Sequence, residues 1–301
     1  MSFRVVIPAR FDSSRLPGKA LLPLAGKPML QWVHERARSS LAAEVIVATD
    51  DERIASAARG FGAEVAMTAR THVSGTDRIA EVAASRGWGE DDIVVNVQGD
   101  EPLIPPVVIN QVAQLLSAHR AAHIATLAAK LEQINDFNDP NTVKVACDVT
   151  GRALYFSRAP IPWNRDATST VTPASLRHIG IYAYRVGALR RLAVLPPGRL
   201  EQIEKLEQLR ALENGMEIRV ALAVERPLAD VNTAADLERA ERALTVRPGV
   251  GHLCHVERAQ HLPGQVLPWH PAADRPCRGD RTRRRSSLDD GAAERTLRHA
   301  A

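Results

Sequence analysis

Apolar runs and amphipathic stretches alternate along the first 247 residues of the chain. Runs that are almost entirely apolar indicate strands covered on both faces, and repeats with helical spacing indicate helices between them. This alternation predicts an α/β fold with a doubly wound, mostly parallel sheet, whose ligands bind at the carboxyl ends of the strands. The predicted strands are residues 3–8, 44–49 and 92–97, and the predicted helices are 29–39, 51–59 and 76–85.

The pattern becomes mixed after Pro102. Strand-like and helix-like segments no longer alternate regularly there, which predicts a mixed part of the sheet. A polar, Thr-rich stretch at 166–173 is typical of a loop, and Asp51 and Ser74 stand where helix N-caps are expected. Further strands are predicted at 124–129, 142–147, 154–157, 177–184 and 217–224, and further helices at 105–118, 200–214 and 234–243.

Composition places the chain among ordinary globular proteins. Of its 301 residues, 45% are apolar and 25% are charged, and with only 4% aromatic residues the core is left to Val, Ile, Leu and Ala. No apolar run approaches membrane-spanning length, and Asp12 and Lys19 interrupt the N-terminal region too early for a signal peptide. The three cysteines form no CxxC pair. We therefore expect a soluble, cytoplasmic protein without a membrane partner.

The last segment, residues 248–301, differs in kind from the rest. It holds nine Arg against six Asp and Glu, or +3 of the formal +4, which leaves about +1 for residues 1–247. Because no basic face runs through that body, nucleic acid is not expected as a partner. The segment contains five of the ten His and two of the three Cys, but their spacing is too irregular for a zinc site. Without periodicity, it predicts a disordered or poorly packed extension of a domain that spans 1–247.

A cationic loop follows the first predicted strand, between Pro8 and Lys19. Arg10, Arg15 and Lys19 place three positive charges on a short loop that also contains Gly18. Arginine grips phosphate oxygens in pairs, lysine adds a point charge, and glycine lets the backbone approach closely. The loop matches neither the Walker A pattern nor GxGxxG. It predicts a triphosphate site, against the simpler alternative of a solvated basic loop.

A second candidate lies where the predicted strand 92–97 ends. The sequence continues as Gln98-Gly99-Asp100-Glu101-Pro102, so Asp100 falls at the carboxyl edge of the sheet. Mg²⁺ commonly takes one or two carboxylates together with phosphate oxygens and water. Asp100 therefore predicts an anchor for Mg²⁺ beside a triphosphate, and the alternative is a cap for the helix after Pro102.

Seven blocks of sequence stand in a fixed order between residues 3 and 245. They are PAR-x₃-SRLPGK from Pro8 with GKPM from Gly26, VATD from Val47, SGTDR from Ser74, NVQGDEP from Asn96, YFSR from Tyr155, RHIGIY from Arg177 and LEQLR from Leu206. In this order they resemble the sugar-activating nucleotidyltransferases, and most closely the cytidylyltransferases that act on 3-deoxy-manno-octulosonate, whereas 248–301 lies outside the resemblance. The resemblance implies a Rossmann-like nucleotidyltransferase sheet with a mixed segment for sugar binding and dimerisation.

The resemblance implies roles for the matched positions near the nucleotide. The expected catalytic residues, which neutralise the leaving pyrophosphate and hold Mg²⁺, are Arg10, Arg15, Lys19 and Asp100. For Ser74 and Thr76, helix capping is the alternative to a contact with the base. The expected nucleotide-binding residues are Pro8, Ala9, Arg10, Gly18, Lys19, Ser74, Gly75, Thr76 and Arg78.

For the sugar acid, the resemblance points mainly to the second half of the chain. Arg158 would supply a cation for the carboxylate, and the other side chains would hydrogen-bond the hydroxyl groups. On the predicted helix 200–214, Glu204, Glu207 and Gln208 fall at i, i+3 and i+4 and would share one face, for which exposed charge is the alternative explanation. The expected sugar-binding residues are Gln98, Arg158, His178, Tyr182, Glu207 and Gln208.

The second metal ligand departs from the family's pattern. The family supplies an Asp in a V-D-T motif, and this chain has Val231-Asn232-Thr233. Asparagine offers a neutral carbonyl oxygen, which attracts Mg²⁺ less strongly than a carboxylate does. We expect Asp100 and Asn232 as metal ligands, with neighbouring Asp230 as the alternative to Asn232.

The implied reaction transfers CMP from CTP to the anomeric hydroxyl of 3-deoxy-D-manno-octulosonate and releases pyrophosphate, for lipopolysaccharide biosynthesis. In-line attack on the α-phosphorus needs no covalent intermediate, so catalysis rests on positioning and electrostatics. The family also implies a homodimer, formed through residues 130–190. The alternatives are a CMP-sialate synthetase or another sugar nucleotidyltransferase and, from a different class, a catalytically silent nucleotide-binding paralogue.

Overall fold

The computed structural model describes residues 2–12, 16–167, 170–228 and 230–245, which all belong to one unit. Arg15 and the predicted extension 248–301 lie outside the described residues. None of the described helices combines the length and the apolar character that crossing a bilayer requires.

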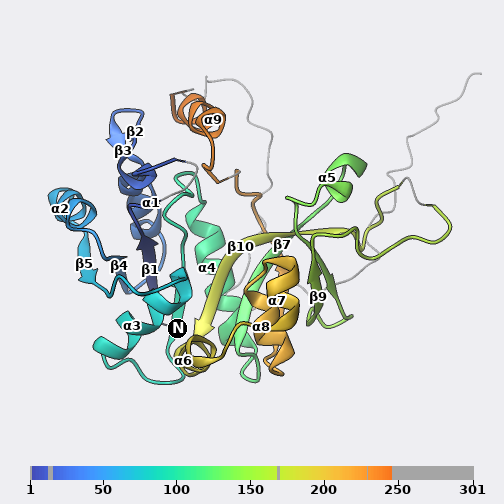
Figure 1. The fold of residues 1–301 in the computed structure, drawn as a ribbon. Coiled ribbons are helices and arrows are strands. Elements are labelled where there is room, and N and C mark those ends of the chain that lie inside the picture. Colours follow the sequence, from blue (N-terminus) through green and yellow to red (C-terminus); the bar gives the residue numbers. More distant parts are fainter. Residues whose placement is uncertain (1, 13–15, 168–169, 229, 246–301) are drawn as a thin grey trace, which may run out of the picture. The chain divides into compact units, whose positions relative to one another are not determined.

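A nine-stranded sheet forms the centre of the described part (Figure 1). Its strands are β1 Arg4–Ala9, β4 Glu44–Thr49, β5 Glu64–Met67, β6 Ile93–Asn96, β7 Ile124–Lys130, β8 Lys144–Cys147, β9 Ala153–Ser157, β10 Leu176–Arg185 and β11 Ile218–Leu222. The main path runs β11–β7–β10–β6–β1–β4–β5, and off this path β8 pairs with β10 and β9 pairs with β8. β6, β1, β4 and β5 are parallel, as are β7 and β11, whereas β10 runs antiparallel to both β6 and β7. The predicted mostly parallel sheet with a mixed segment is confirmed.

Helices cover both faces of this sheet (Figure 1). They are α1 Met29–Arg38, α2 Glu52–Gly60, α3 Gly75–Ser85, α4 Pro106–Ala118, α5 Ile134–Asn138, α6 Val186–Val194, α7 Arg199–Glu204, α8 Gln208–Glu213 and α9 Ala234–Thr245. α1, α2 and α4 contribute to one buried cluster, and α3, α6 and α8 contribute to another. A small hairpin, β2 Pro23–Leu24 with β3 Lys27–Pro28, packs against α9 through a third cluster.

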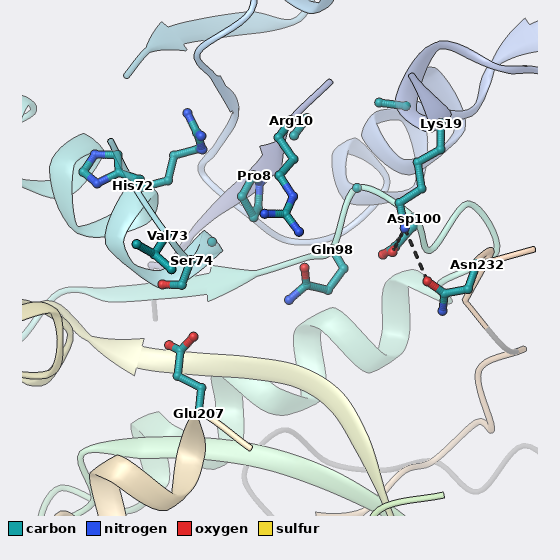
Figure 2. A pocket seen from close by; sticks show the side chains of 15 residues that line it. Pro8, Arg10, Lys19, His72, Val73, Ser74, Gln98, Asp100, Glu207 and Asn232 are labelled. Carbon is teal, nitrogen blue, oxygen red and sulfur yellow. Dashed lines mark hydrogen bonds and ion pairs between the residues drawn. The ribbon is translucent and has the colours of Figure 1, made fainter. Parts of the chain in front are cut away.

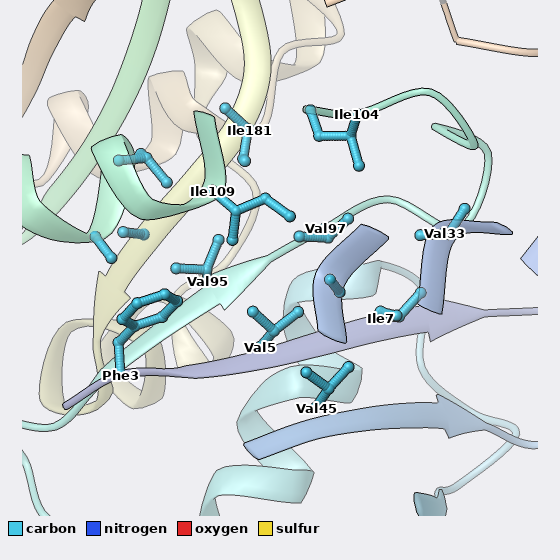
Figure 3. Close-up of a cluster of buried hydrophobic side chains, with 14 of the residues drawn as sticks. Phe3, Val5, Ile7, Val33, Val45, Val95, Val97, Ile104, Ile109 and Ile181 are labelled. Atoms are coloured by element: carbon cyan, nitrogen blue, oxygen red, sulfur yellow. The ribbon is translucent and has the colours of Figure 1, made fainter. Parts of the chain in front are cut away.

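Burial on both faces explains why the central strands read as unbroken apolar runs. On β1, Val5 and Ile7 face the cluster that α1 and α4 cover, whereas Val6 faces the cluster of α3 and α6. The same alternation separates Val95 from Val94 on β6. Figure 3 shows the first cluster, where side chains of β1 and β6 converge. A strand that is covered on both faces needs an apolar residue at almost every position.

Most predicted elements are confirmed within two residues at their ends. Asp51 caps α2 as predicted, because its Oδ1 accepts a hydrogen bond from the Arg53 N–H at 2.9 Å. The sequence patterns missed β5, α5 and α6, and also the two-residue strands β2 and β3. β5 is only partly buried at the sheet edge, which weakens its apolar signal, and α6 follows β10 directly without a side-chain N-cap.

The single helix predicted over 200–214 is wrong. α7 ends at Glu204, and Lys205 adopts a left-handed conformation with φ 54° before α8 begins. The carboxylate of Glu204 accepts hydrogen bonds from Ser157 Oγ at 2.6 Å and from the Arg158 N–H at 2.9 Å. These bonds tether the end of α7 to β9, so a tertiary contact overrides the local helical pattern. Glu204 therefore does not share one helix face with Glu207 and Gln208, as the single helix had predicted.

Candidate active site

The loop after β1 is closed by a backbone hydrogen bond. The Gly18 N–H donates to the Phe11 carbonyl oxygen at 2.9 Å, and Gly18 has a φ of +67°, in the left-handed region. A Cβ at this position would be strained and would come within 3.0 Å of the Phe11 ring. Lys19 follows at once in the short helix η1, Lys19–Leu21. Gly18 therefore shapes the loop that presents the cations, and it lines neither cavity described below.

Two other glycines bring three segments together around Pro8. A Cβ on Gly99 would lie 3.0 Å from the Pro8 carbonyl oxygen, and a Cβ on Gly75 would lie 3.2 Å from the Pro8 ring. The ends of β1 and β6 and the start of α3 therefore meet at this point. Exposed backbone N–H groups at such a junction can approach a phosphate directly.

Helix α3 begins at the junction with a capping box. The Asp77 N–H donates to Ser74 Oγ and the Ser74 N–H donates to Asp77 Oδ2, each at 3.1 Å. The predicted capping role of Ser74 is thereby confirmed. The amino end of a helix attracts anions through its unpaired N–H groups and its dipole, so α3 adds positive potential here.

These segments surround a first cavity of about 420 Å³ (Figure 2). Its wall combines residues from β1, η1, α3, the loop after β6 and the segment before α9. The structure therefore brings together residues that lie far apart in the sequence. The predicted residues on this wall are Pro8, Ala9, Arg10, Lys19, Ser74, Gly75, Arg78, Gln98, Asp100, Glu207 and Asn232.

Two arginines of the wall differ in their electrostatic state. Arg10 is exposed, and among the described residues it has no ion-pair partner. Arg78 is buried, lies 3.3 Å from the Asp50 carboxylate and hydrogen-bonds Thr68 Oγ1. Of these two arginines, an anion can therefore reach Arg10 without breaking an ion pair between described residues, whereas Arg78 is already neutralised by Asp50.

Lys19 connects the two expected metal ligands. Its Nζ forms an ion pair with the Asp100 carboxylate and lies 3.5 Å from Asn232 Oδ1 (Figure 2). The Val231 N–H donates to the Asp100 carbonyl oxygen at 2.9 Å, which fixes the segment before α9 against the loop after β6. Asn232 Nδ2 donates to the Asp230 carboxylate, which leaves Oδ1 directed at Lys19.

This donor set fits a hard divalent cation. Asp100 and Asn232 each direct an oxygen atom at the Lys19 ammonium, and Mg²⁺ prefers oxygen ligands. Burial raises the pKa of Glu101 to about 8, and the nearby charges of Asp100 and Asp230 add to this rise, so Glu101 is mostly protonated at pH 7 and adds little negative charge to the site. Glu101 Oε2 is buried without a hydrogen-bond partner. The described residues contain no cluster of three His, Cys, Asp or Glu suited to a metal, so phosphate oxygens and water would have to complete the coordination.

A second cavity of about 160 Å³ adjoins the first, because Gly75, Gln98 and Glu207 line both. Four expected sugar-binding residues lie on its wall: Gln98, Tyr182, Glu207 and Gln208. Thr76, which was expected among the nucleotide-binding residues, lines this second cavity and not the first.

Glu207 stands at the boundary between the two cavities. Burial raises the pKa of its carboxyl, and a hydrogen bond from Thr76 and the charge of Arg210 oppose that rise. Thr76 also hydrogen-bonds the Tyr184 hydroxyl. Carboxyl, hydroxyl and amide groups thus surround a small space, which supplies the donors and acceptors that a hydroxyl-rich ligand requires.

Arg158 and His178 line neither cavity. Arg158 donates from Nε to the Glu204 carbonyl oxygen at 2.7 Å and from a terminal nitrogen to the Pro140 carbonyl oxygen at 2.9 Å. His178 Nε2 lies 3.0 Å from Thr126 Oγ1, and burial lowers the pKa of the imidazole to about 3. His178 is therefore neutral at pH 7, and contact of either residue with the sugar stays a prediction.

His72, Asn96 and Tyr184 also line the cavities, although no role was predicted for them. A signal for Asn96 is present in the sequence, since it is a polar residue inside an otherwise apolar strand. Tyr184 lies two residues after Tyr182 on β10 and so points to the same face. His72 pairs with Glu81 through Nε2, and nothing in its sequence context marks it.

Known proteins similar to this chain agree on one family. Residues 4–218 match the family model described as cytidylyltransferase. Proteins of Thioalkalivibrio sulfidiphilus and Pseudomonas fluorescens, both named 3-deoxy-manno-octulosonate cytidylyltransferase, are 54% and 56% identical to it. Each match covers 81% of this chain, and 99% and 98% of the respective relative.

Two solved structures are similar to this chain, one in sequence and fold and one in fold alone. The structure of CMP:2-keto-3-deoxy-manno-octonic acid synthetase complexed with CTP has a TM-score of 0.75 and 43% identity, over 81% of this chain and 98% of that chain. A cytidylyltransferase from Leptospira borgpetersenii, with a TM-score of 0.53 and 18% identity over 79% of this chain and 84% of that chain, shares the fold alone. The chain therefore belongs to the cytidylyltransferase family and, within it, to the 3-deoxy-manno-octulosonate cytidylyltransferases.

Proposed function

We propose that this protein transfers CMP from CTP to the anomeric hydroxyl of 3-deoxy-D-manno-octulosonate and releases pyrophosphate, as a step of lipopolysaccharide biosynthesis. The names of the relatives support this reaction. The observation that carries it is the pair of adjoining cavities, one rich in phosphate-binding features and one walled by hydroxyl, amide and carboxyl groups. Donor and acceptor substrates can meet at the boundary of the two cavities, where Gln98 and Glu207 line both of them.

CTP would occupy the first cavity with its triphosphate along the loop after β1. Arg10 would bind phosphate oxygens with its exposed guanidinium, and Lys19 would add a second positive charge. Gly99 and Gly75 permit close approach of the backbone, and the amino end of α3 adds its dipole. We also propose that Arg15 takes part, on the basis of the family's motif.

The acceptor hydroxyl would attack the α-phosphorus in line with the departing pyrophosphate. A new oxygen–phosphorus bond forms as the bond between the α-phosphorus and the oxygen that bridges to the β-phosphorus breaks, and the hydroxyl proton is lost to solvent, so no covalent enzyme intermediate is needed. Arg10 and Lys19 stabilise the charge that develops on the leaving group. Catalysis therefore consists mainly of positioning and electrostatic stabilisation.

We assign Mg²⁺ to Asp100 and Asn232, whose oxygen atoms meet at one cation position. When bound, the ion neutralises negative charge on the phosphate oxygens. Asp230 remains the alternative ligand in sequence, but its carboxylate accepts a hydrogen bond from Asn232 Nδ2. That bond favours Asn232 as the ligand and Asp230 as the group that orients it.

Pyrophosphate release from every pairing of donor and acceptor tests the function. CTP, ATP and GTP would each be incubated with Mg²⁺ and either 3-deoxy-D-manno-octulosonate or N-acetylneuraminate. We expect release with CTP and the octulosonate alone. Release with N-acetylneuraminate would instead indicate a CMP-sialate synthetase, similar release from all three nucleotides would contradict cytidine specificity, and no release at all would identify a silent paralogue.

We further propose a homodimer that forms through residues 130–190. Exposed apolar side chains support this surface, since Leu154 is 55% and Trp163 is 62% accessible. Sedimentation of the wild type and of Trp163→Ser would test it, with a monomeric wild type as the contrary result. We place the reaction in the cytoplasm, where CTP is available, and assign it to residues 1–247, with 248–301 as an extension that takes no part.

A further inference from the structure

Asn96 is a polar residue at the end of a strand that is otherwise apolar. Only 3% of its surface is accessible, and its neighbours on β6 are the fully or nearly fully buried residues Ile93, Val94 and Val95. Its Oδ1 is buried and has no hydrogen-bond partner. A buried amide oxygen without a partner destabilises a fold, so its presence needs an explanation other than packing.

Other buried polar side chains in the same part of the sheet are satisfied. Thr126 Oγ1 lies 2.7 Å from the Ile181 carbonyl oxygen and 3.0 Å from His178 Nε2. The fully buried Lys144 ammonium donates to three backbone carbonyl oxygens at 2.6 to 2.9 Å. Thr126 and Lys144 are therefore satisfied within the protein, whereas Asn96 Oδ1 shares its lack of a partner, among the buried side-chain atoms of the described residues, only with Glu101 Oε2.

The Asn96 side chain lies on the wall of the second cavity. In the β6–β10 ladder Asn96 stands opposite Tyr182, so the two side chains lie on the same face of the sheet. Thr76 and Glu207 line the same cavity from α3 and from the turn before α8. A volume of 160 Å³ corresponds to roughly five water molecules, which suits part of a sugar and is too small for a nucleoside triphosphate.

We propose that Asn96 is a specificity-determining residue that hydrogen-bonds hydroxyl groups of the acceptor sugar acid in the second cavity. This inference rests on the proposed function and adds a residue to its acceptor site. A side-chain amide both donates and accepts, as does each sugar hydroxyl, so one amide can pair with one or two hydroxyls. The unpaired amide is stabilised when the sugar is bound, and the protein without sugar carries it as a cost to stability.

The decisive test is whether Asn96→Leu raises or lowers the melting temperature of the protein without sugar. Asn96→Leu removes an unpaired polar group and keeps a similar volume, so its melting temperature should equal or exceed that of the wild type. Thr126→Val is the matched control for stability, because it removes a hydroxyl that is already hydrogen-bonded, and its melting temperature should fall. If the Asn96 amide were instead hydrogen-bonded to protein or water in the sugar-free protein, the melting temperature of Asn96→Leu would fall as that of Thr126→Val does.

Steady-state kinetics supply the second readout. In Asn96→Leu the KM for 3-deoxy-D-manno-octulosonate should rise about tenfold, the effect of losing one or two hydrogen bonds, while the KM for CTP stays within about twofold. If Asn96→Leu fails to fold, Asn96→Asp decides, because it keeps the shape and loses both N–H donors. It should raise the KM for the sugar acid in the same selective way.

Two results would overturn the inference without touching the proposed function. The first is a wild type that releases pyrophosphate while the variants retain its KM for the sugar acid. The second is a loss of stability in Asn96→Leu as large as that in Thr126→Val, with substrate affinities unchanged. A wild type that releases no pyrophosphate from CTP and the octulosonate would instead refute the proposed function itself.

Discussion

Replacing His178 with glutamine tests how strongly the fold holds this imidazole in its neutral form. The ring is enclosed between Phe156 and Tyr182, with centroid distances of 5.0 and 5.3 Å, and its Nε2 faces Thr126 Oγ1. Burial, reinforced by the charge of Arg177, lowers the pKa of His178 from 6.5 to about 3. Glutamine can still reach a hydrogen-bond partner but does not titrate between pH 5 and 8.

The sign of the effect follows from proton binding. Below pH 6.5 the unfolded chain protonates His178 while the folded protein does not, so folding loses stability as the pH falls from 6.5 towards 3. Each pH unit in that interval is worth about 1.4 kcal/mol. At pH 5 the loss amounts to about 2 kcal/mol, and this is an upper bound because the residue as a whole is partly exposed.

Urea unfolding of the wild type and of His178→Gln at pH 7.5 and pH 5.0 measures this pH-dependent loss of unfolding free energy. The variant loses packing at both pH values, so only the difference between the two pH changes is informative. We expect the wild type to lose up to about 2 kcal/mol more than the variant on going from pH 7.5 to pH 5.0. Equal losses in the two proteins would refute the conclusion that His178 is held neutral.

Four further predictions concern the nucleotide side and the end of the chain. Asp100→Ala should lower turnover at least about a hundredfold in a folded protein, and near-normal turnover in this variant would remove the metal assignment. Asn232→Asp should strengthen Mg²⁺ binding, as measured by titration calorimetry. Gly99→Ala should lower kcat by roughly ten- to a hundredfold because its Cβ would lie 3.0 Å from a backbone oxygen, and Gly60→Ala, with open space around its Cβ, should match the wild type. Deleting 248–301 should leave melting temperature and kcat unchanged, and an insoluble or inactive product would contradict this.

The sequence alone determined the central strands, the cationic loop and the helix caps. These features are local: a strand covered on both faces needs consecutive apolar residues, and a cap needs one side chain at a helix start. Asp100 could be placed at the sheet edge because it directly follows a buried strand. Arg10, Lys19 and Asp100 then converge because parallel strands end at the same edge.

Tertiary structure decided what depends on contacts between distant segments. The Glu204 carboxylate accepts hydrogen bonds from Ser157 and Arg158 where α7 ends. Glu207 and Gln208, which follow, line the second cavity, although the sequence pattern predicts one continuous helix. The antiparallel position of β10 between β6 and β7 sets Tyr182 opposite Asn96. Neither follows from spacing along the chain, because the free energy of each arrangement comes from partners that folding alone brings together. The unpaired amide of Asn96 is therefore evident only in the folded protein.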